Sequence, residues 1–360
     1  MKTTDTRLAA LIERIGGLDE VAMAEAARRQ DQLTKPARSL GRLEELAVQL
    51  AGITGSALPP IPARKAVIVM AADHGVAAEG VSAYPREVTP QMVLNFLSGG
   101  AGINVLARAA GARVVVVDMG VAGELPAHPD LRAHRIGPGT RDLAREPAMT
   151  REEAERAIAT GAAIVDEEAA RGLDLVATGD MGIGNTTSAS AIVAALTGRP
   201  AAEVVGRGTG IDDATYARKV RVVETALALH RPDPTDALGV LAAVGGFEIA
   251  GLAGVVLAGA AHRIPVILDG FISGAAGLAA ASLAPACRPY LIAAHRSVEV
   301  GHRVVLDRLG LRPILDLDLR LGEGTGAALA MPIVEAAVRV HREMATFAEA
   351  QVSDRERRDA

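Results

Sequence analysis

The sequence predicts an α/β protein whose parallel sheet is covered by helices on both faces, in a Rossmann-like arrangement, with a small helical domain added. From residue 66 onward, short runs rich in Val, Ile and Leu alternate with alanine-rich stretches of helical character. Strands of a parallel sheet are buried on both faces and therefore appear as continuous apolar runs. We expect such strands at residues 67–70, 114–117, 173–176, 265–268 and 290–293.

The N-terminal part of the chain differs from this pattern. Residues 21–33 and 43–51 carry apolar side chains at three- and four-residue spacing, which is typical of amphipathic helices. Residues 55–62 contain three prolines, which fix φ and remove backbone donors. The first 60 residues are therefore expected to form a helical segment that precedes the main domain.

Capping residues mark several helix boundaries between the strands. Thr150 followed by Glu153 matches a capping box, and the helix that it opens can end at Gly172. Thr89 before Pro90 offers a similar cap, with proline at the first helical position.

A last helix, roughly residues 333–345, follows the predicted sheet, and we expect it to pack on the N-terminal helices. Residues 1–60 with 331–360 then form the small helical domain, and residues 61–330 form the α/β catalytic domain. The charged residues 353–359 are expected to form a solvated tail.

The composition argues against several classes of protein. A chain of 360 residues, 49% of them hydrophobic, can bury a core without disulfides or structural metals. The net charge is -5, aromatic residues make up 2% and tryptophan is absent. The net charge is slightly negative and stacking side chains are scarce, so we expect no nucleic-acid partner.

The cysteine content and the apolar segments predict a cytoplasmic protein. Cys287 is the single cysteine and has no partner for an internal disulfide. The first apolar cluster, residues 8–12, is too short for a signal peptide. Residues 237–261 and 271–287 are rich in Gly and Ala, and neither reaches the ~18 strongly apolar residues of a membrane span. We therefore interpret both as buried helices and expect no membrane partner.

Acidic and histidine side chains follow nearly every predicted strand. Open α/β sheets bind ligands at the carboxyl ends of their strands, so these side chains should meet in one crevice. They are Asp73, His74, Asp118, Asp180, Asp269 and His295.

The strongest single motif runs from Gly182 to Thr187, between a predicted strand and a predicted helix over 188–196. Its glycines allow close approach of the backbone, and the first helix amides with two hydroxyls suit a phosphate at the positive end of the helix dipole. The same residues also fit a plain turn in which Thr186 or Thr187 caps the helix, and no lysine follows as in a P-loop.

Two further glycine-rich turns are candidates for the same site. Residues 206–212 can close over the ligand, although taken alone they also fit an ordinary loop. Residues 322–326 place Glu323 between glycines, which can present its carboxylate to a cavity, so Glu323 is the candidate general base. The alternative is a surface glutamate in a turn before a helix.

The sequence predicts no metal site and no cofactor. Asp316 and Asp318 could share one face of an extended stretch, but such pairs are more often solvated. The histidines show no H-E-x-x-H spacing, and Asp73 with His74 can form a structural hydrogen-bonded pair. No strand ends in two adjacent acids followed by a phosphate-cradling turn, so nothing in the sequence requires magnesium.

These motifs together resemble the nicotinate-nucleotide:dimethylbenzimidazole phosphoribosyltransferase family. The resemblance covers almost the whole chain, so chance agreement of one motif does not account for it. The matching segments are residues 33–41, 73–76, 79–82, 184–187, 268–271, 289–292 and 321–330.

The resemblance implies transfer of phosphoribose from nicotinate mononucleotide to 5,6-dimethylbenzimidazole, which gives α-ribazole 5'-phosphate for the lower ligand of cobalamin. Nicotinate leaves as a neutral ring nitrogen, so its departure needs neither a metal nor a general acid. Attack by one benzimidazole nitrogen leaves a cationic ring, and Glu323 relieves that charge by removing the proton of the other nitrogen. Inversion at the anomeric carbon yields the α product.

The resemblance also implies a set of binding residues and a homodimer, for which the helical termini offer surfaces. The chain departs from the family pattern at Asp180, where a glutamate is typical, and at Tyr84, where a smaller side chain can occur. The nucleotide and its phosphate are expected at Asp180, Gly182, Gly184, Asn185, Thr186, Thr187, Gly206, Gly208 and Ser297, and the benzimidazole at Tyr84, Met92 and Leu321.

A second function remains compatible with parts of the sequence, whereas a third does not fit its glycine turns. A nucleotide-sensing α/β module would use the glycine loops without catalysis, and Glu323 is the residue that distinguishes it from an enzyme. A dehydrogenase would place G-x-G-x-x-G after the first strand, and neither of the first two glycine turns has that spelling and position.

Overall fold

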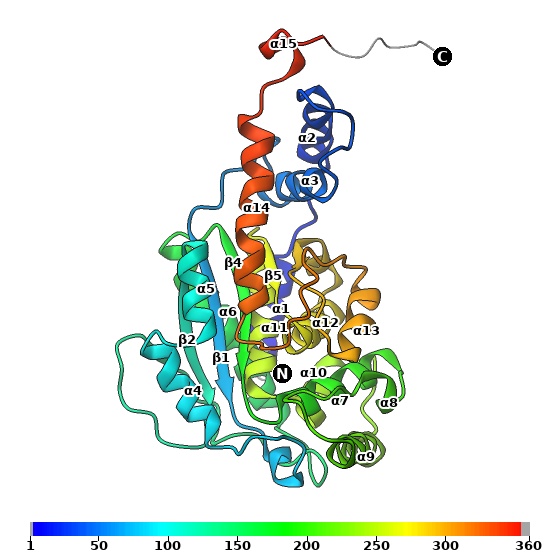
Figure 1. The fold of residues 1–360 in the computed structure, drawn as a ribbon. Coiled ribbons are helices and arrows are strands. Elements are labelled where there is room, and N and C mark those ends of the chain that lie inside the picture. The colour runs from blue at the N-terminus through cyan, green and yellow to red at the C-terminus, as the bar shows by residue number, and fades with distance from the viewer. Residues whose placement is uncertain (1–2, 354–360) are drawn as a thin grey trace.

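A six-stranded parallel sheet forms the centre of the molecule in this computed structural model, which describes residues 3–353 (Figure 1). The strand order β3-β2-β1-β4-β5-β6 is that of a doubly wound fold, with the order reversing between β1 and β4. The strands are β1 (Lys65–Ala72), β2 (Ala112–Gly120), β3 (Leu131–Ala133), β4 (Leu175–Met181), β5 (Val266–Leu268) and β6 (Leu291–Ala293).

The predicted fold class and the five predicted strands are confirmed. Successive residues of β1 point to opposite faces, so Ile68 and Met70 join one apolar core while Val67 and Val69 join the other. Strand β3 was not predicted. It is a three-residue edge strand that is half-buried or exposed, and it therefore leaves no apolar run in the sequence.

Helices cover both faces of the sheet, and in Figure 1 α4, α5 and α14 lie in front of it, with α6 and α11 behind. One layer contains α6 (Arg151–Ala170), α7 (Asn185–Thr197), α10 (Ala237–Val244), α11 (Phe247–Ala261) and α12 (Phe271–Leu283). The other contains α3 (Arg42–Thr54), α4 (Val88–Leu97), α5 (Gly102–Ala110) and α14 (Thr325–Glu343). The remaining elements are α1 (Thr3–Glu13), α2 (Glu20–Gln32), η1 (Gly75–Glu79), α8 (Ala201–Val204), α9 (Asp213–His230), η2 (Pro285–Tyr290), α13 (Val300–Leu309) and α15 (Phe347–Ala350).

One of the two predicted helix caps is confirmed. The Thr150 hydroxyl accepts the amide of Glu153, and the Glu153 carboxylate accepts the amide of Thr150, as a capping box requires. The cap predicted at Thr89 is wrong, because α4 begins at Val88 and Thr89 is buried inside its first turn. The Thr89 hydroxyl instead accepts the amide of Ile183 and so supports the loop after β4.

The N-terminal helices α2 and α3 pack together, and α14 lies against α3, as predicted. Figure 1 shows α14 rising from the front of the sheet towards α2 and α3. This helix begins at Thr325, earlier than the predicted start near residue 333, and it contains Pro332. The division into residues 1–60 with 331–360 and residues 61–330 stays a prediction, and most of the predicted tail lies outside the described residues.

The two apolar stretches form buried helices, as predicted, namely α10 with α11 and then α12. Within residues 3–353 no helix is both long and apolar enough to cross a membrane. Because glycines lie at their interface, α11 and α6 pack so closely that their backbones are in contact. A Cβ added to Gly161 of α6 would overlap the carbonyl oxygen of Gly251, and one added to Gly254 of α11 would overlap that of Ile158.

We therefore predict that Gly161→Ala lowers the free energy of unfolding by about 2 kcal/mol. A carbonyl oxygen in a helix cannot move aside as a side chain can, so the overpacking should cost about 3 kcal/mol. The better helix propensity of alanine returns about 1 kcal/mol. Urea denaturation measures the difference.

Gly17→Ala is the matched control, because Gly17 is exposed and a Cβ there meets nothing within 4 Å. A midpoint for Gly161→Ala equal to that of Gly17→Ala would contradict the close contact between α6 and α11.

Candidate active site

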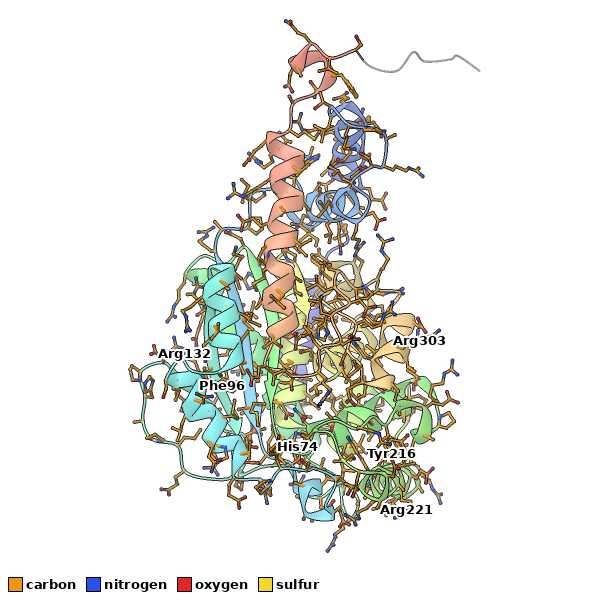
Figure 2. The ribbon with its side chains drawn as sticks, in the orientation of Figure 1. His74, Phe96, Arg132, Tyr216, Arg221 and Arg303 are labelled. Carbon is orange, nitrogen blue, oxygen red and sulfur yellow. The ribbon has the colours of Figure 1, made fainter. Side chains whose placement is uncertain are left out.

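A cavity of about 540 Å³ opens at the carboxyl-terminal edge of the sheet. Its wall is built by the loop after β4, the start of α12, the residues after β6 and the segment 318–322 ahead of α14. In Figure 2, His74 marks this edge at the lower end of the sheet. The cavity lies where open α/β sheets bind ligands, next to the reversal of strand order.

The structure brings most of the predicted substrate-binding residues to this cavity. Three others lie outside its lining: Thr187 is fully buried in α7, Gly206 packs against Glu299, and Met92 packs against the core from α4. The predicted general base Glu323 is also outside the lining, and it is buried next to the lining residue Gly322. The predicted residues that line the cavity are Tyr84, Asp180, Gly182, Gly184, Asn185, Thr186, Gly208, Ser297 and Leu321.

The first glycine loop turns directly into the helix α7. Gly184 has φ 97°, in the left-handed region that favours glycine, and it occupies the N-cap position. Neither Thr186 nor Thr187 caps the helix, because both lie inside its first turn. The N-terminus of α7 with the Thr186 side chain therefore borders the cavity, and its dipole favours an anion there.

A buried lysine that the sequence does not single out lies beside this loop. Lys219 of α9 is 1% exposed, and its Nζ donates to the Thr186 hydroxyl at 2.7 Å and to the Gly206 carbonyl at 3.2 Å. Burial lowers the pKa of Lys219 to about 8, while the charge of Glu299 acts in the opposite direction. Lys219 stands mid-helix outside any motif, so only the folded chain shows its place.

Three consecutive residues of the turn before α14 lie in the left-handed region: Gly322 at φ 79°, Glu323 at 62° and Gly324 at 90°. A non-glycine residue in this region costs about 1–3 kcal/mol, and the strain persists only where its surroundings impose it. Here Asp269 imposes it, since its carboxylate accepts the amides of Gly324 at 3.3 Å and Ala327 at 2.9 Å. Asp269 was predicted only as an acid at a strand end.

The carboxylate of Glu323 is held in place and largely removed from solvent. The residue is 5% exposed, and its Oε2 accepts the amide of Ile103, in the first turn of α5, at 3.1 Å. Within residues 3–353 its Oε1 has no hydrogen-bond partner. Burial raises the pKa of Glu323, the Ile103 amide lowers it, and the charge of Asp269 raises it further. A raised pKa suits a general base that works near neutral pH.

Two more buried acids adjoin Glu323. Burial raises the pKa of Asp180 well above its usual range, and the charges of Asp269 and other nearby acids add to this. Asp180 accepts the side-chain amide of Asn185 at 3.0 Å. Burial also raises the pKa of Asp269, and His295, 3.8 Å away, opposes that rise. Each of these carboxyls therefore holds its proton more tightly than an exposed one, because burial and neighbouring acids disfavour the charged form.

A buried hydrogen-bonded pair of side chains packs against the first glycine loop. His74 Nε2 lies 2.6 Å from Glu248 Oε1, and both side chains are fully buried. A Cβ added to Gly182 would lie 3.3 Å from each of them. The pairing of Asp73 with His74 considered from the sequence is wrong, because Asp73 accepts the amide of Ala122 instead.

The mouth of the cavity offers apolar surface to a flat ligand. Tyr84 is 55% exposed and Leu321 is 59% exposed, and both line the cavity. Ile183 and Phe271 add apolar surface deeper in the wall. The lining therefore combines the polar N-terminus of α7 with the exposed apolar side chains of Tyr84 and Leu321.

Comparison with known proteins gives one consistent result. The chain matches the family described as Phosphoribosyltransferase over residues 15–352. The nicotinate-nucleotide–dimethylbenzimidazole phosphoribosyltransferase of Chloroflexus aggregans is 64% identical over 344 residues, covering 96% of this chain and 97% of the relative. The protein of the same name from Roseiflexus sp. (strain RS-1) is 63% identical over 346 residues, covering 96% and 98%.

Solved structures agree with these matches. A crystal structure from Thermus thermophilus, again of a nicotinate-nucleotide–dimethylbenzimidazole phosphoribosyltransferase, has a TM-score of 0.90 and 53% sequence identity, covering 94% of this chain and 100% of that chain. The resemblance seen in the motifs is thereby confirmed. The chain belongs to the nicotinate-nucleotide–dimethylbenzimidazole phosphoribosyltransferase family.

Proposed function

We propose that this chain transfers phosphoribose from nicotinate mononucleotide to 5,6-dimethylbenzimidazole with Glu323 as the general base. The products are nicotinate and α-ribazole 5'-phosphate, the precursor of the lower ligand of cobalamin. One observation carries the assignment of roles: a buried carboxylate, strained and hydrogen-bonded into place, stands beside a cavity whose other end suits a phosphate.

The phosphate of the nucleotide binds at the N-terminus of α7. The loop 182–186, which includes Thr186, lines that end of the cavity, and Gly208 of the second glycine turn lines it as well. Lys219 supplies the positive charge, since its Nζ already lies 2.7 Å from the Thr186 hydroxyl. A phosphate monoester carries between one and two negative charges near pH 7, which a helix N-terminus and a buried lysine both stabilise.

The leaving group needs little help from the protein. Nicotinate bound through its ring nitrogen is a pyridinium, and it departs with that nitrogen neutral. The mechanism therefore uses no acid to protonate the leaving group and no metal step, and the reaction is expected to proceed in the presence of a chelator. What the chain's residues do is fix the sugar phosphate while the second substrate approaches from the opposite face of the ribose.

Activation of the azole falls to Glu323. One ring nitrogen attacks the anomeric carbon, and the proton on the other nitrogen passes to Glu323, so the ring remains neutral as the new bond forms. Tyr84 and Leu321 hold the flat ring at the mouth of the cavity, and Met92 is a further candidate behind them. Attack opposite to the leaving nicotinate inverts the anomeric carbon and gives the α product.

We predict that Glu323→Gln lowers the azole-dependent release of nicotinate by about 10²–10⁴-fold, the usual contribution of a general base. The glutamine keeps the size of the side chain and an oxygen for the Ile103 amide, but it cannot take a proton. Nucleotide binding should stay close to that of the parent. The assay follows nicotinate and α-ribazole phosphate by mass, with a chelator present.

Asp316→Asn is the control, because Asp316 is exposed on the same segment and does not line the cavity. Azole-dependent turnover that survives Glu323→Gln would remove Glu323 from the reaction. A parent chain that binds the nucleotide without any turnover would instead indicate the non-catalytic sensor.

The pH profile gives a second test of the same role. Because the pKa of Glu323 is raised, the carboxyl is protonated and inactive below that pKa and becomes an active base above it. The rate should therefore fall as the pH is lowered, with an apparent pKa above the ordinary glutamate value of about 4.3. Initial rates at saturating substrates measure this apparent pKa. An apparent pKa at or below the ordinary glutamate value contradicts Glu323 as the general base.

A homodimer in the cytoplasm completes the proposal. Large apolar side chains such as Leu94 of α4 and Val105 of α5 are 42% and 52% exposed on the helical layer in front of the sheet, and a second copy could cover them. The cytoplasm suits a chain whose single cysteine, Cys287, is buried and free. Light scattering on the eluting protein should give twice the chain mass, and the mass of one chain contradicts the dimer.

A further inference from the structure

We propose that Glu299 is a positioning residue for nucleotide binding, which fixes the second glycine turn and supplies the counter-charge for Lys219. This inference rests on the proposed phosphate site and adds the group that stands behind it. Glu299 lines the cavity, but its carboxylate accepts from the Gly208 amide, so it would act through the turn and the lysine.

The carboxylate of Glu299 packs directly on the second glycine turn. Glu299 precedes α13, is 7% exposed, and its Oε1 accepts the amide of Gly208 at 2.8 Å. A Cβ on Gly206 would overlap its Oε2, so the carboxylate lies flat against the backbone of the turn. Its own amide donates to the hydroxyl of Ser297, a predicted nucleotide-binding residue, at 3.3 Å.

Lys219 approaches the same turn from α9. Its Nζ donates to the carbonyl of Gly206, and a Cβ added to Gly208 would lie 3.2 Å from Nζ and 2.9 Å from the Thr186 hydroxyl. The turn is therefore contacted by a carboxylate, by an ammonium group and by the guanidinium of Arg320, which donates to the Gly208 carbonyl at 3.2 Å, and the first glycine loop lies beside it. A change at Glu299 acts on two parts of the phosphate site together.

Glu299 is the charged group that acts on Lys219 within the described residues. Its charge raises the pKa of Lys219, against the larger effect of burial, which lowers it. The neighbouring helices α7 and α10 contain no ionisable side chains. Of the other charged side chains nearby, Glu203 pairs with Arg199 and Arg207 pairs with Asp213, while Arg218 donates to the Gly80 carbonyl. Arg320 donates to the Gly208 carbonyl at 3.2 Å, and Arg221 and Glu224 lie on the exposed face of α9.

The charge of Lys219 explains why the carboxylate of Glu299 lies next to the proposed phosphate site. A lysine that is nearly fully buried loses its proton readily unless a negative charge compensates it. With Glu299 present the pKa of Lys219 stays at about 8, so most of the lysine is charged at neutral pH. Without that charge the lysine would become neutral at lower pH and attract phosphate less. Glu299 thereby sets the upper pH limit of nucleotide binding.

The test is Glu299→Gln, which keeps an oxygen for the Gly208 amide and removes the charge. We expect the KM for nicotinate mononucleotide to rise, while kcat at saturating nucleotide changes by less than about threefold. The pH above which KM increases should move downward. At pH values above the pKa of Lys219 in both proteins, lowering that pKa by one unit reduces the charged fraction of Lys219 about tenfold.

Three further variants make the result specific. Glu299→Asp keeps the charge, so the pH limit should remain parental even if the shorter side chain weakens binding uniformly. Glu224→Gln on the exposed face of α9 removes a charge of the same kind and should leave the profile unchanged. In a Lys219→Met background, Glu299→Gln should have little additional effect on the pH limit, since both substitutions remove one interaction.

The inference would be overturned if KM began to increase at the same pH in Glu299→Gln as in the parent. It would also be overturned if the effects of Glu299→Gln and Lys219→Met on KM were additive. If Glu299→Gln does not fold, as judged by its thermal transition, a shifted limit in Glu299→Asp overturns it equally. Calorimetric binding of nicotinate mononucleotide to the full chain keeps this test separate from the reaction. If the parent chain binds the nucleotide normally but shows no turnover, the proposed function is wrong. The role of Glu299 is then judged from the pH dependence of nucleotide binding alone.

Discussion

A glutamate forced into a left-handed turn is the constraint on which the proposed reaction depends. Glu323 sits between two glycines of the same conformation, and the turn is packed so closely on β4 that a Cβ at Gly179 would overlap the Glu323 carbonyl. Asp269, after β5, holds the following amides, and the start of α5 holds the carboxylate. Several elements that are distant in sequence therefore fix one side chain, and the sheet brings them together.

Acidic groups and an anion-binding helix terminus both border the cavity. Burial raises the pKa of Asp180, which lines it, and of Asp269 and Glu323 nearby. The N-terminus of α7, with Lys219 beside it, favours an anion. A nucleotide phosphate and an azole that must lose a proton need both kinds of group. The same burial that makes a carboxyl a better base makes the lysine a weaker cation, which is why the lysine needs a counter-charge.

The sequence predicted the fold well because buried parallel strands leave continuous apolar runs, as in 67–70 and 114–117. It missed β3, whose three residues are too exposed to leave such a run. Motif residues were placed at the right sheet edge, since glycine loops mark close backbone approach. Lys219 could not be found in this way, because a lysine inside a helix carries no local signal and only the packing of α9 against α7 brings it to the site.

The sequence also failed to predict the hydrogen-bond partners of buried side chains. The sequence suggested Asp73 for His74, whereas the structure supplies Glu248 from a helix far along the chain. Thr89 looked like a cap and instead supports the loop after β4. Such pairings depend on which elements the topology places side by side, and the local sequence around each residue does not contain that information.

The most direct test of the central claim is a crystal structure of this chain with 5,6-dimethylbenzimidazole bound. The account predicts the ring between Tyr84 and Leu321, with one ring nitrogen about 2.6–3.2 Å from the Glu323 carboxylate. A ring bound elsewhere, or one whose nitrogens both face solvent with Glu323 still buried behind the wall, would contradict it.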